Sequence, residues 1–145
     1  MTIARICQRD VDSAMASESV RTAAQRMSSR SVGTLLVLDA QRRPIGILTD
    51  RDLALRVVSE GRVPATTSVE DVMTRGLVTL SDTASIDDAL ALMRAKAVRR
   101  LPVVGGDGRV VGLVSMDDIL ALMAHEMWQL GRLIARSSPS ALAEA

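Results

Sequence analysis

The stretch Gly46-Ile-Leu-Thr-Asp-Arg-Asp52 has the same pattern as Gly112-Leu-Val-Ser-Met-Asp-Asp118. Each begins with a glycine, carries a hydroxyl residue three positions later, and has an aspartate three positions after that. The offset of 66 residues between them also gives ten identities when residues 4–58 are set against residues 70–124, with no gap. A gapless internal repeat of this length indicates two copies of one supersecondary unit.

The residues before each stretch predict the rest of the unit. Apolar residues recur at helical spacing in residues 20–27 and again in 86–93. A continuous apolar run follows each of them and predicts a buried strand, which a short turn joins to a second strand as a hairpin. The predicted strands are residues 34–39 and 44–48 in the first copy, and 101–104 and 110–114 in the second.

The hydroxyl residue and the aspartate of each stretch match a capping box, which opens a helix. We expect the helix after Thr49 to end near Gly61, where glycine favours a stop. The helix after Ser115 is expected to continue past Trp128 to about Arg136.

Each unit thus combines a small three-stranded sheet with two helices on one side, which leaves one sheet face open. Two such units can cover both faces by packing face to face with pseudo-two-fold symmetry. The expected fold class is α/β (α+β). The expected organisation is a first repeat in residues 1–66, a second in residues 67–128, and a helix extension with a frayed tail in residues 129–145.

Composition excludes several classes of protein. The chain has 145 residues, of which 48% are hydrophobic and 24% charged, with a net charge of +1; these values are typical of globular domains and not of disordered chains. The balanced charge and the absence of Phe and Tyr argue against direct nucleic-acid binding. Without an apolar run of about 20 residues or a secretory leader, we expect no membrane span and a cytoplasmic location.

Chemistry-bearing residues are few. Cys7 and His125 are each the single residue of their type, so a Cys/His zinc site is excluded by counting. No nucleophile motif accompanies His125. We therefore expect no metal site, no catalytic residues and no enzymatic activity.

Two further stretches, Asp71-Val-Met-Thr74 and Val98-Arg-Arg-Leu-Pro-Val-Val104, complete a familiar pattern. With the doubled box they make residues 4–128 resemble a tandem pair of CBS domains, also called a Bateman module. The chain is similar to small stand-alone bacterial CBS-pair proteins, some linked to stress or hypoxia responses. The resemblance implies a regulatory, energy-sensing module that binds an adenine nucleotide (AMP, ADP or ATP) between its repeats, forms a homodimer and acts on an unidentified regulated protein.

The resemblance also implies two nucleotide sites, in which the hydroxyl residue contacts phosphate and the aspartate binds ribose. At the first site, the Thr49 site, we expect Arg51, Arg99 and Arg100 to favour a polyphosphate ligand. Asp52→Ala should therefore weaken nucleotide binding more than Asp118→Ala. The second, the Ser115 site, comprises Ser115, Met116 and Asp118, with Asp12 to Met15 and Gly33-Thr34. The Thr49 site comprises Thr49, Arg51 and Asp52, with Val78, Thr79, Leu80 and Ala84 around the base and Arg99 and Arg100 near the phosphates.

Several alternatives stay open. The boxes could also be ordinary N-caps with no binding role. Arg99 and Arg100 could also lie at a solvent-exposed strand end. The module could be a ligand-free interaction or dimerisation unit, or a sensor of S-adenosylmethionine or NAD. The broad apolar face of the last helix could pack on its own module or form a dimer contact with Trp128 as an anchor.

Overall fold

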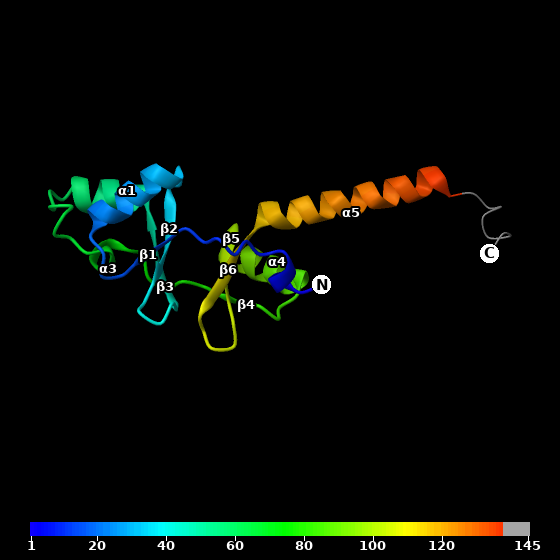
Figure 1. Cartoon of the computed structure of the whole chain (residues 1–145), viewed down its shortest axis with the longest axis horizontal. Coiled ribbons are helices and arrows are strands. Elements are labelled where there is room, and N and C mark those ends of the chain that lie inside the picture. Colours follow the sequence, from blue (N-terminus) through cyan, green and yellow to red (C-terminus); the bar gives the residue numbers. More distant parts are fainter. Residues whose placement is uncertain (138–145) are drawn as a thin grey trace.

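The computed structural model of the chain describes residues 1–137 (Figure 1). Two three-stranded sheets form, each with its strands in sequence order. In each sheet the first strand runs parallel to the second, and the second and third form an antiparallel hairpin. The strands are β1 (Ser13–Met15), β2 (Thr34–Leu38) and β3 (Pro44–Thr49), then β4 (Leu80–Ser81), β5 (Arg100–Val104) and β6 (Val110–Ser115).

The helices confirm the predicted mixed α/β class. The two long amphipathic segments are α1 (Val20–Arg30) and α4 (Ile86–Lys96), each capped at its start by a serine side chain. The remaining helices are the 3-10 turn η1 (Ile3–Arg5), α2 (Asp50–Leu53) with the π-helical turn η2 (Ala54–Val58), α3 (Val69–Val72) and α5 (Met116–Arg136).

The helix after Thr49 differs from its prediction. It is α-helical only to Leu53 and then widens, so that the Ser59 amide donates to the Ala54 carbonyl at 2.9 Å, five residues back. Gly61 then turns the chain with a φ of 67°, a conformation that glycine adopts without strain.

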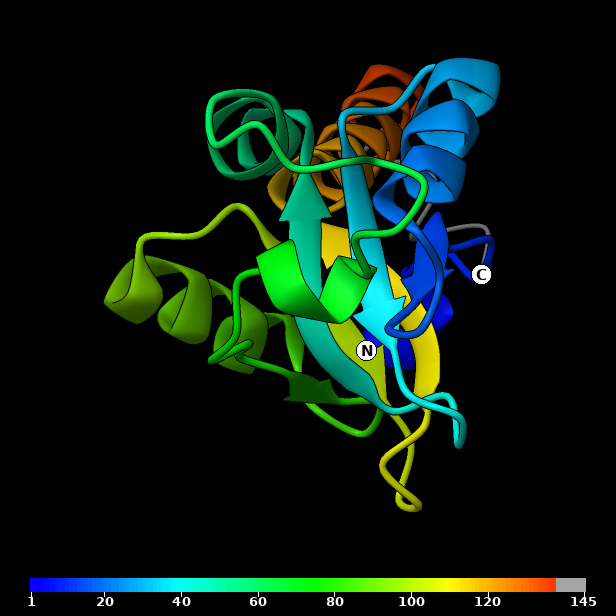
Figure 2. The ribbon, with the colours of Figure 1, turned by 90° about the vertical axis from the view of Figure 1, so that its left-hand side faces the viewer.

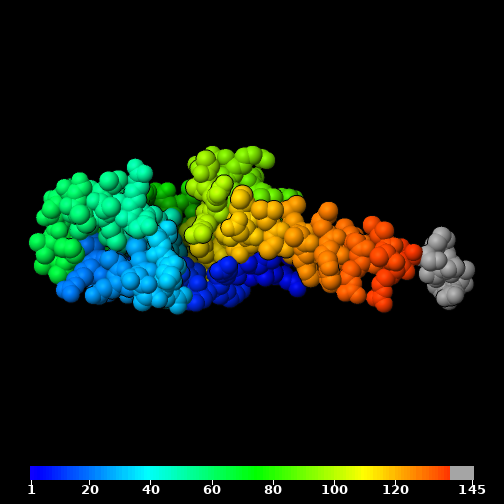
Figure 3. All heavy atoms as spheres, turned by 90° about the horizontal axis from the view of Figure 1, so that it is seen from above, coloured from blue at the N-terminus to red at the C-terminus, as the bar shows by residue number. Residues whose placement is uncertain are grey.

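The two repeats exchange their opening segments. Ile3 is fully buried in the core of the second repeat, and Val69 and Val72 are buried in the core of the first. Figure 3 shows the N-terminal residues, in blue, alongside the second repeat. Each repeat therefore contributes part of the other's hydrophobic core.

A third apolar cluster joins the two sheets. Leu36, Leu38 and Val110 are buried there, with Val11, Ile47 and Leu77 packed against them. Figure 2, seen from the side of the first repeat, shows this repeat in front of the second. A cavity lined by residues of both repeats opens beside this cluster.

The last helix, α5, leaves the body of the molecule (Figures 1 and 3). Its range confirms the prediction of a helix to about Arg136. Ile119 is its last buried residue. The predicted frayed tail falls largely on residues 138–145, outside the described residues. No described helix has the length and apolarity needed to cross a membrane.

Candidate functional site

Both repeated boxes form complete capping boxes. The Ser115 amide donates to Asp118 Oδ2 at 2.8 Å, and the Asp118 amide donates to Ser115 Oγ at 3.1 Å. The Thr49 box has the same pair of bonds, at 2.9 and 3.1 Å. The capping interpretation is therefore confirmed for both. Each hydroxyl accepts a bond in its box and keeps its hydrogen for another acceptor.

A cavity of about 420 Å³ opens between the repeats at the Ser115 box. The second repeat supplies the box, the start of β5 and an apolar wall. The first repeat supplies the loop between α1 and β2, parts of β2 and β3, and the segment that crosses from one repeat to the other. The lining residues are Gln8, Asp10, Val11, Asp12, Ser31, Val32, Gly33, Thr34, Leu36, Ile47, Arg100, Pro102, Leu113, Ser115 and Asp118.

Arg100, which the sequence assigned to the Thr49 site, lies beside the Ser115 box. Arg100 pairs directly with Ser115 across the β5–β6 hairpin. Residues opposite each other on neighbouring strands lie on the same face of a sheet, and Arg100 accordingly lines the Ser115 cavity. Arg99 is also tied to this box, because its carbonyl accepts from the Met116 amide at 2.8 Å. The Ser115 cavity therefore has an arginine in its lining, a feature that the sequence predicted for the Thr49 site.

The two box aspartates differ in what their second oxygen contacts. Asp118 Oδ1 accepts a hydrogen bond from Gln8 Nε2 at 3.0 Å. Asp52 Oδ1 lies 3.9 Å from Arg56 Nε, an ion pair within its own helix. Any hydrogen-bond donor that approaches Asp118 Oδ1 must therefore share this oxygen with the Gln8 amide or displace the amide.

The remaining predicted residues of the Thr49 site fall into two groups. Leu80 is buried, and Val78 and Ala84 pack with it against the core of the second repeat. Arg51 and Thr79 are exposed. Whether these residues and the Thr49 box share one ligand site stays a prediction.

The crossing segment brings carboxylates to the rim of the cavity. Arg30, at the end of α1, donates to Asp12 Oδ1 at 2.6 Å and to Asp10 Oδ2 at 2.9 Å. Hydrogen bonds to Asp10 and Asp12, and their charges, raise the pKa of Arg30. These ion pairs fix the segment against the end of α1.

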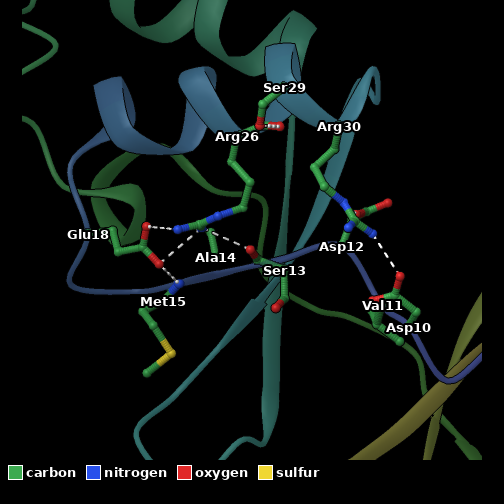
Figure 4. A pocket seen from close by; sticks show the side chains of 10 residues that line it. All are labelled: Asp10, Val11, Asp12, Ser13, Ala14, Met15, Glu18, Arg26, Ser29 and Arg30. Carbon is green, nitrogen blue, oxygen red and sulfur yellow. Dashed lines mark hydrogen bonds and ion pairs between the residues drawn. The ribbon is translucent and has the colours of Figure 1, made fainter.

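A neighbouring hollow of about 410 Å³ lies between β1 and α1 (Figure 4). Ser13, Ala14 and Met15, which the sequence assigned to the Ser115 site, line this hollow. Asp12 lines both this hollow and the Ser115 cavity. The Arg26 guanidinium donates two hydrogen bonds to the Glu18 carboxylate, at 3.1 and 2.8 Å. Burial raises the pKa of Glu18, but the hydrogen bonds from Arg26 and the Met15 amide, with the Arg26 charge, hold it below its ordinary value. Arg26 and Glu18 thus form their hydrogen bonds and ion pair with each other. This pairing favours a structural role for the hollow.

Sequence reasoning missed most of the cavity wall. Gln8 lies in the cavity because it forms a backbone bridge with Leu113 on β6. No local sequence signal marks Gln8, because its position depends on the exchange of opening segments between the repeats. The other missed lining residues are Asp10, Val11, Ser31, Val32, Leu36, Ile47, Pro102 and Leu113. Among residues 1–137, no group of three or more His, Cys, Asp and Glu side chains is placed to hold a metal ion.

Comparison with known proteins gives a consistent result. The sequence model of the CBS domain matches residues 3–59 and 69–125. Hypoxic response protein 1 of Mycobacterium tuberculosis is 33% identical over 127 residues, which cover 87% of each chain. An uncharacterized protein of Methanopyrus kandleri is 32% identical over 120 residues, 83% of this chain but only 61% of that one.

Solved structures agree. A crystal structure of Hypoxic Response Protein I with two coordinated zinc ions superposes with a TM-score of 0.73 and 30% identity, over 83% of this chain and 98% of that one. Two more distant structures share the fold. One is a CBS domain protein of Pyrobaculum aerophilum complexed with AMP (TM-score 0.67, 22% identity, 81% and 89% of the two chains). The other is a CBS domain pair in complex with 5-methylthioadenosine and S-adenosyl-L-methionine (TM-score 0.69, 24% identity, 87% and 98%).

Proposed function

Since the chain belongs to the CBS domain family, with two CBS domains in tandem, we propose that it is a regulatory module that binds an adenosine nucleotide in the Ser115 cavity. The observation that carries the proposal is the cavity itself. It brings a hydroxyl, a carboxylate and a guanidinium, from Ser115, Asp118 and Arg100, against the loop of the other repeat. A ligand bound there would contact both repeats and so change how tightly they are held together.

The cavity has the size and chemistry for a nucleoside. Small-molecule pockets typically occupy about 300–1,000 Å³ and combine apolar walls with a few polar groups. Leu36, Ile47, Pro102 and Leu113 supply an aliphatic wall for a base. Asp118 supplies an acceptor for ribose hydroxyls, and Arg100 a partner for a phosphate. AMP and S-adenosylmethionine occur in the two distant structures and support this ligand class.

The charges around the cavity favour few phosphates. Among residues 1–137, three aspartates, Asp10, Asp12 and Asp118, and one arginine, Arg100, line the cavity. Arg30 is paired with Asp10 and Asp12. Even with Arg30 counted, Asp10, Asp12 and Asp118 outnumber Arg30 and Arg100, so a triphosphate would meet a net negative rim. We infer that AMP binds here more tightly than ATP, and that a cationic adenosyl ligand such as S-adenosylmethionine is the main competitor. A polyphosphate at the Thr49 site stays a separate prediction.

The test is thermal unfolding with AMP, ATP and S-adenosylmethionine, followed by titration calorimetry. A ligand at 100 times its Kd should stabilise the fold by about 2.7 kcal/mol, a shift of several degrees in Tm. Asp118→Asn should weaken AMP binding about tenfold or more, because a charged hydrogen-bond acceptor contributes roughly 1.5–3 kcal/mol.

A matched control separates binding from capping. Asp88 forms the same box with Ser85 on α4, with bonds of 2.9 and 3.0 Å, and does not line the cavity. Asp88→Asn should lower Tm to a similar extent without changing AMP affinity. Asp52→Asn tests the Thr49 site: if it abolishes AMP binding while Asp118→Asn does not, the assignment to the Ser115 cavity is wrong.

A ligand-free interaction module is the second candidate. It is favoured by Asp118, both of whose oxygens already accept hydrogen bonds within the protein. Absence of any Tm shift with millimolar nucleotides would support this function and contradict the first. In either case we infer that the chain acts as a homodimer on an unidentified regulated protein, as the resemblance implies.

A further inference from the structure

Arg30 lies beside the Ser115 cavity and is bonded to two carboxylates that line it. Its Nε donates to Asp12 Oδ1 at 2.6 Å, and its Nη2 donates to Asp10 Oδ2 at 2.9 Å. Figure 4 shows the Arg30 side chain reaching from the end of α1 toward both aspartates. The aspartates line the cavity, whereas Arg30 lines the neighbouring hollow. Arg30 would therefore act on a ligand in the cavity through its charge and through the position of the two carboxylates.

The fold of the repeat does not require this cluster of charges. At the offset of 66 residues, the two aspartates correspond to Gly76 and Val78, and Arg30 corresponds to Lys96. The second repeat forms the same sheet order without either carboxylate. The Arg30 and Asp10 side chains are also 46% and 85% exposed, and ion pairs as exposed as this contribute little to stability. The cluster is therefore a feature of this cavity and not of the repeat.

The charge at the rim of the cavity depends on Arg30. Among the described residues, three carboxylates and one guanidinium line the cavity. Arg30 adds a second positive charge in direct contact with two of these carboxylates. Without Arg30, a phosphate in the cavity would face both carboxylates uncompensated, and repulsion between like charges would weaken its binding. The same loss would favour a cationic ligand and would leave an uncharged ligand unaffected.

We propose that Arg30 sets the charge selectivity of the Ser115 cavity. By pairing with Asp10 and Asp12, it raises the affinity for a phosphate-bearing adenosine ligand and lowers the affinity for a cationic one. The proposal rests on the proposed function and adds the residue that distinguishes between its ligands. Arg30 is a positioning residue, because it acts through the two aspartates, whereas Arg100 lines the cavity itself.

Titration calorimetry with three adenosine compounds tests the proposal, because the compounds share the nucleoside and differ in charge. Near neutral pH, AMP is anionic, adenosine is uncharged and S-adenosylmethionine carries a net positive charge. Arg30→Gln should weaken AMP binding about fivefold, the effect of one unit charge about 4 Å from another in water. It should leave adenosine binding unchanged and strengthen S-adenosylmethionine binding. The ratio of AMP affinity to S-adenosylmethionine affinity should therefore fall about tenfold.

A purely structural role for Arg30 predicts a different result. If Arg30 only holds the opening segment in place, Arg30→Gln weakens all three compounds equally, and this outcome would overturn the proposal. Arg26→Gln is the matched control, because Arg26 lies one turn earlier on α1 and pairs with Glu18, and neither residue lines the Ser115 cavity. Arg26→Gln should lower Tm and leave the ratio of affinities unchanged.

Two further variants test charge separately from shape. Arg30→Lys keeps the positive charge and should retain most of the wild-type ratio of AMP affinity to S-adenosylmethionine affinity. Asp12→Asn removes a carboxylate from the rim and should shift this ratio in the opposite direction, toward AMP. High salt should narrow the difference between the wild type and Arg30→Gln, because salt screens exposed charges. An equal loss of AMP affinity in Arg30→Lys and Arg30→Gln would contradict a role for the charge.

The outcomes separate this proposal from the proposed function. If none of the three compounds binds to the wild-type chain, the proposed function is wrong, and the role of Arg30 is wrong with it. If the wild type binds them and Arg30→Gln has the same ratio of affinities, only the role of Arg30 is wrong. If a single charged compound binds to the wild type, its affinity relative to adenosine replaces the ratio and should change in the direction given above.

Discussion

Asp118 performs two tasks with its two oxygens. Oδ2 caps the start of α5 by accepting from the Ser115 amide, and Oδ1 accepts from the Gln8 side chain. Gln8 belongs to the opening segment of the chain. The Asp118 carboxylate therefore connects this segment to the second repeat. A ribose bound to Asp118, as proposed, would compete with Gln8, and the affinity of the nucleotide would include the loss of that hydrogen bond.

This competition gives a prediction for Gln8→Ala. The variant should bind AMP about fivefold more tightly, because a net hydrogen-bond contribution of about 1 kcal/mol no longer opposes the ligand. Titration calorimetry measures the change. Arg9→Ala, at the next residue and also exposed, should leave the affinity unchanged. Weaker binding by Gln8→Ala would mean that the amide contacts the ligand instead of competing with it.

At the scale of elements, the third strand of each sheet has a glycine where the opening segment of the other repeat packs closely against it. A Cβ on Gly112 would lie 2.7 Å from Cys7 Sγ and 2.8 Å from the Gln8 carbonyl oxygen. A Cβ on Gly46 would meet Met73 Sδ and the Thr74 carbonyl oxygen at the same two distances. The glycine that opens each repeated stretch therefore admits the opening segment of the other repeat.

Gly112→Ala should consequently destabilise the protein by roughly 1–3 kcal/mol, the usual cost of overpacking. The expected readout is a Tm lower by several degrees. Gly106→Ala is the matched control, since a Cβ there meets nothing within 4 Å and the residue does not need a positive φ. Equal Tm values for the two variants would contradict the close-approach argument.

Local signals explain why the elements were predictable. Apolar runs predicted β2 and β5, and the Thr49-x-x-Asp52 and Ser115-x-x-Asp118 boxes predicted the starts of α2 and α5. All four depend on residues close in sequence. The widening of the helix at Ala54–Val58 could not be predicted, because no local pattern distinguishes it from an α-helix.

The candidate site was less predictable because it depends on register and topology. The box residues were identifiable from their spacing. The placement of Arg100 required the β5–β6 register, which puts it opposite Ser115. Gln8 and Asp10 required the exchanged opening segment, a long-range feature that a repeat offset alone does not reveal.

For the whole molecule, the exchange of segments makes the two repeats one folding unit. Residues from the start of the chain complete the second core, and residues from its middle complete the first. Neither repeat can unfold without exposing part of the other's core. The chain should therefore unfold in one cooperative transition, although its sequence contains two copies of one unit.

Ile3→Ala tests this coupling, because Ile3 is fully buried in the second core but begins the first repeat. Truncation of a buried Ile to Ala costs about 2–5 kcal/mol. The expected result in scanning calorimetry is a single transition at lower temperature, with the calorimetric and van't Hoff enthalpies still equal. Arg5→Ala, on the same segment but exposed, should leave the transition in place. Two resolved transitions in Ile3→Ala, of which only one moved, would mean that the repeats fold independently despite the exchange.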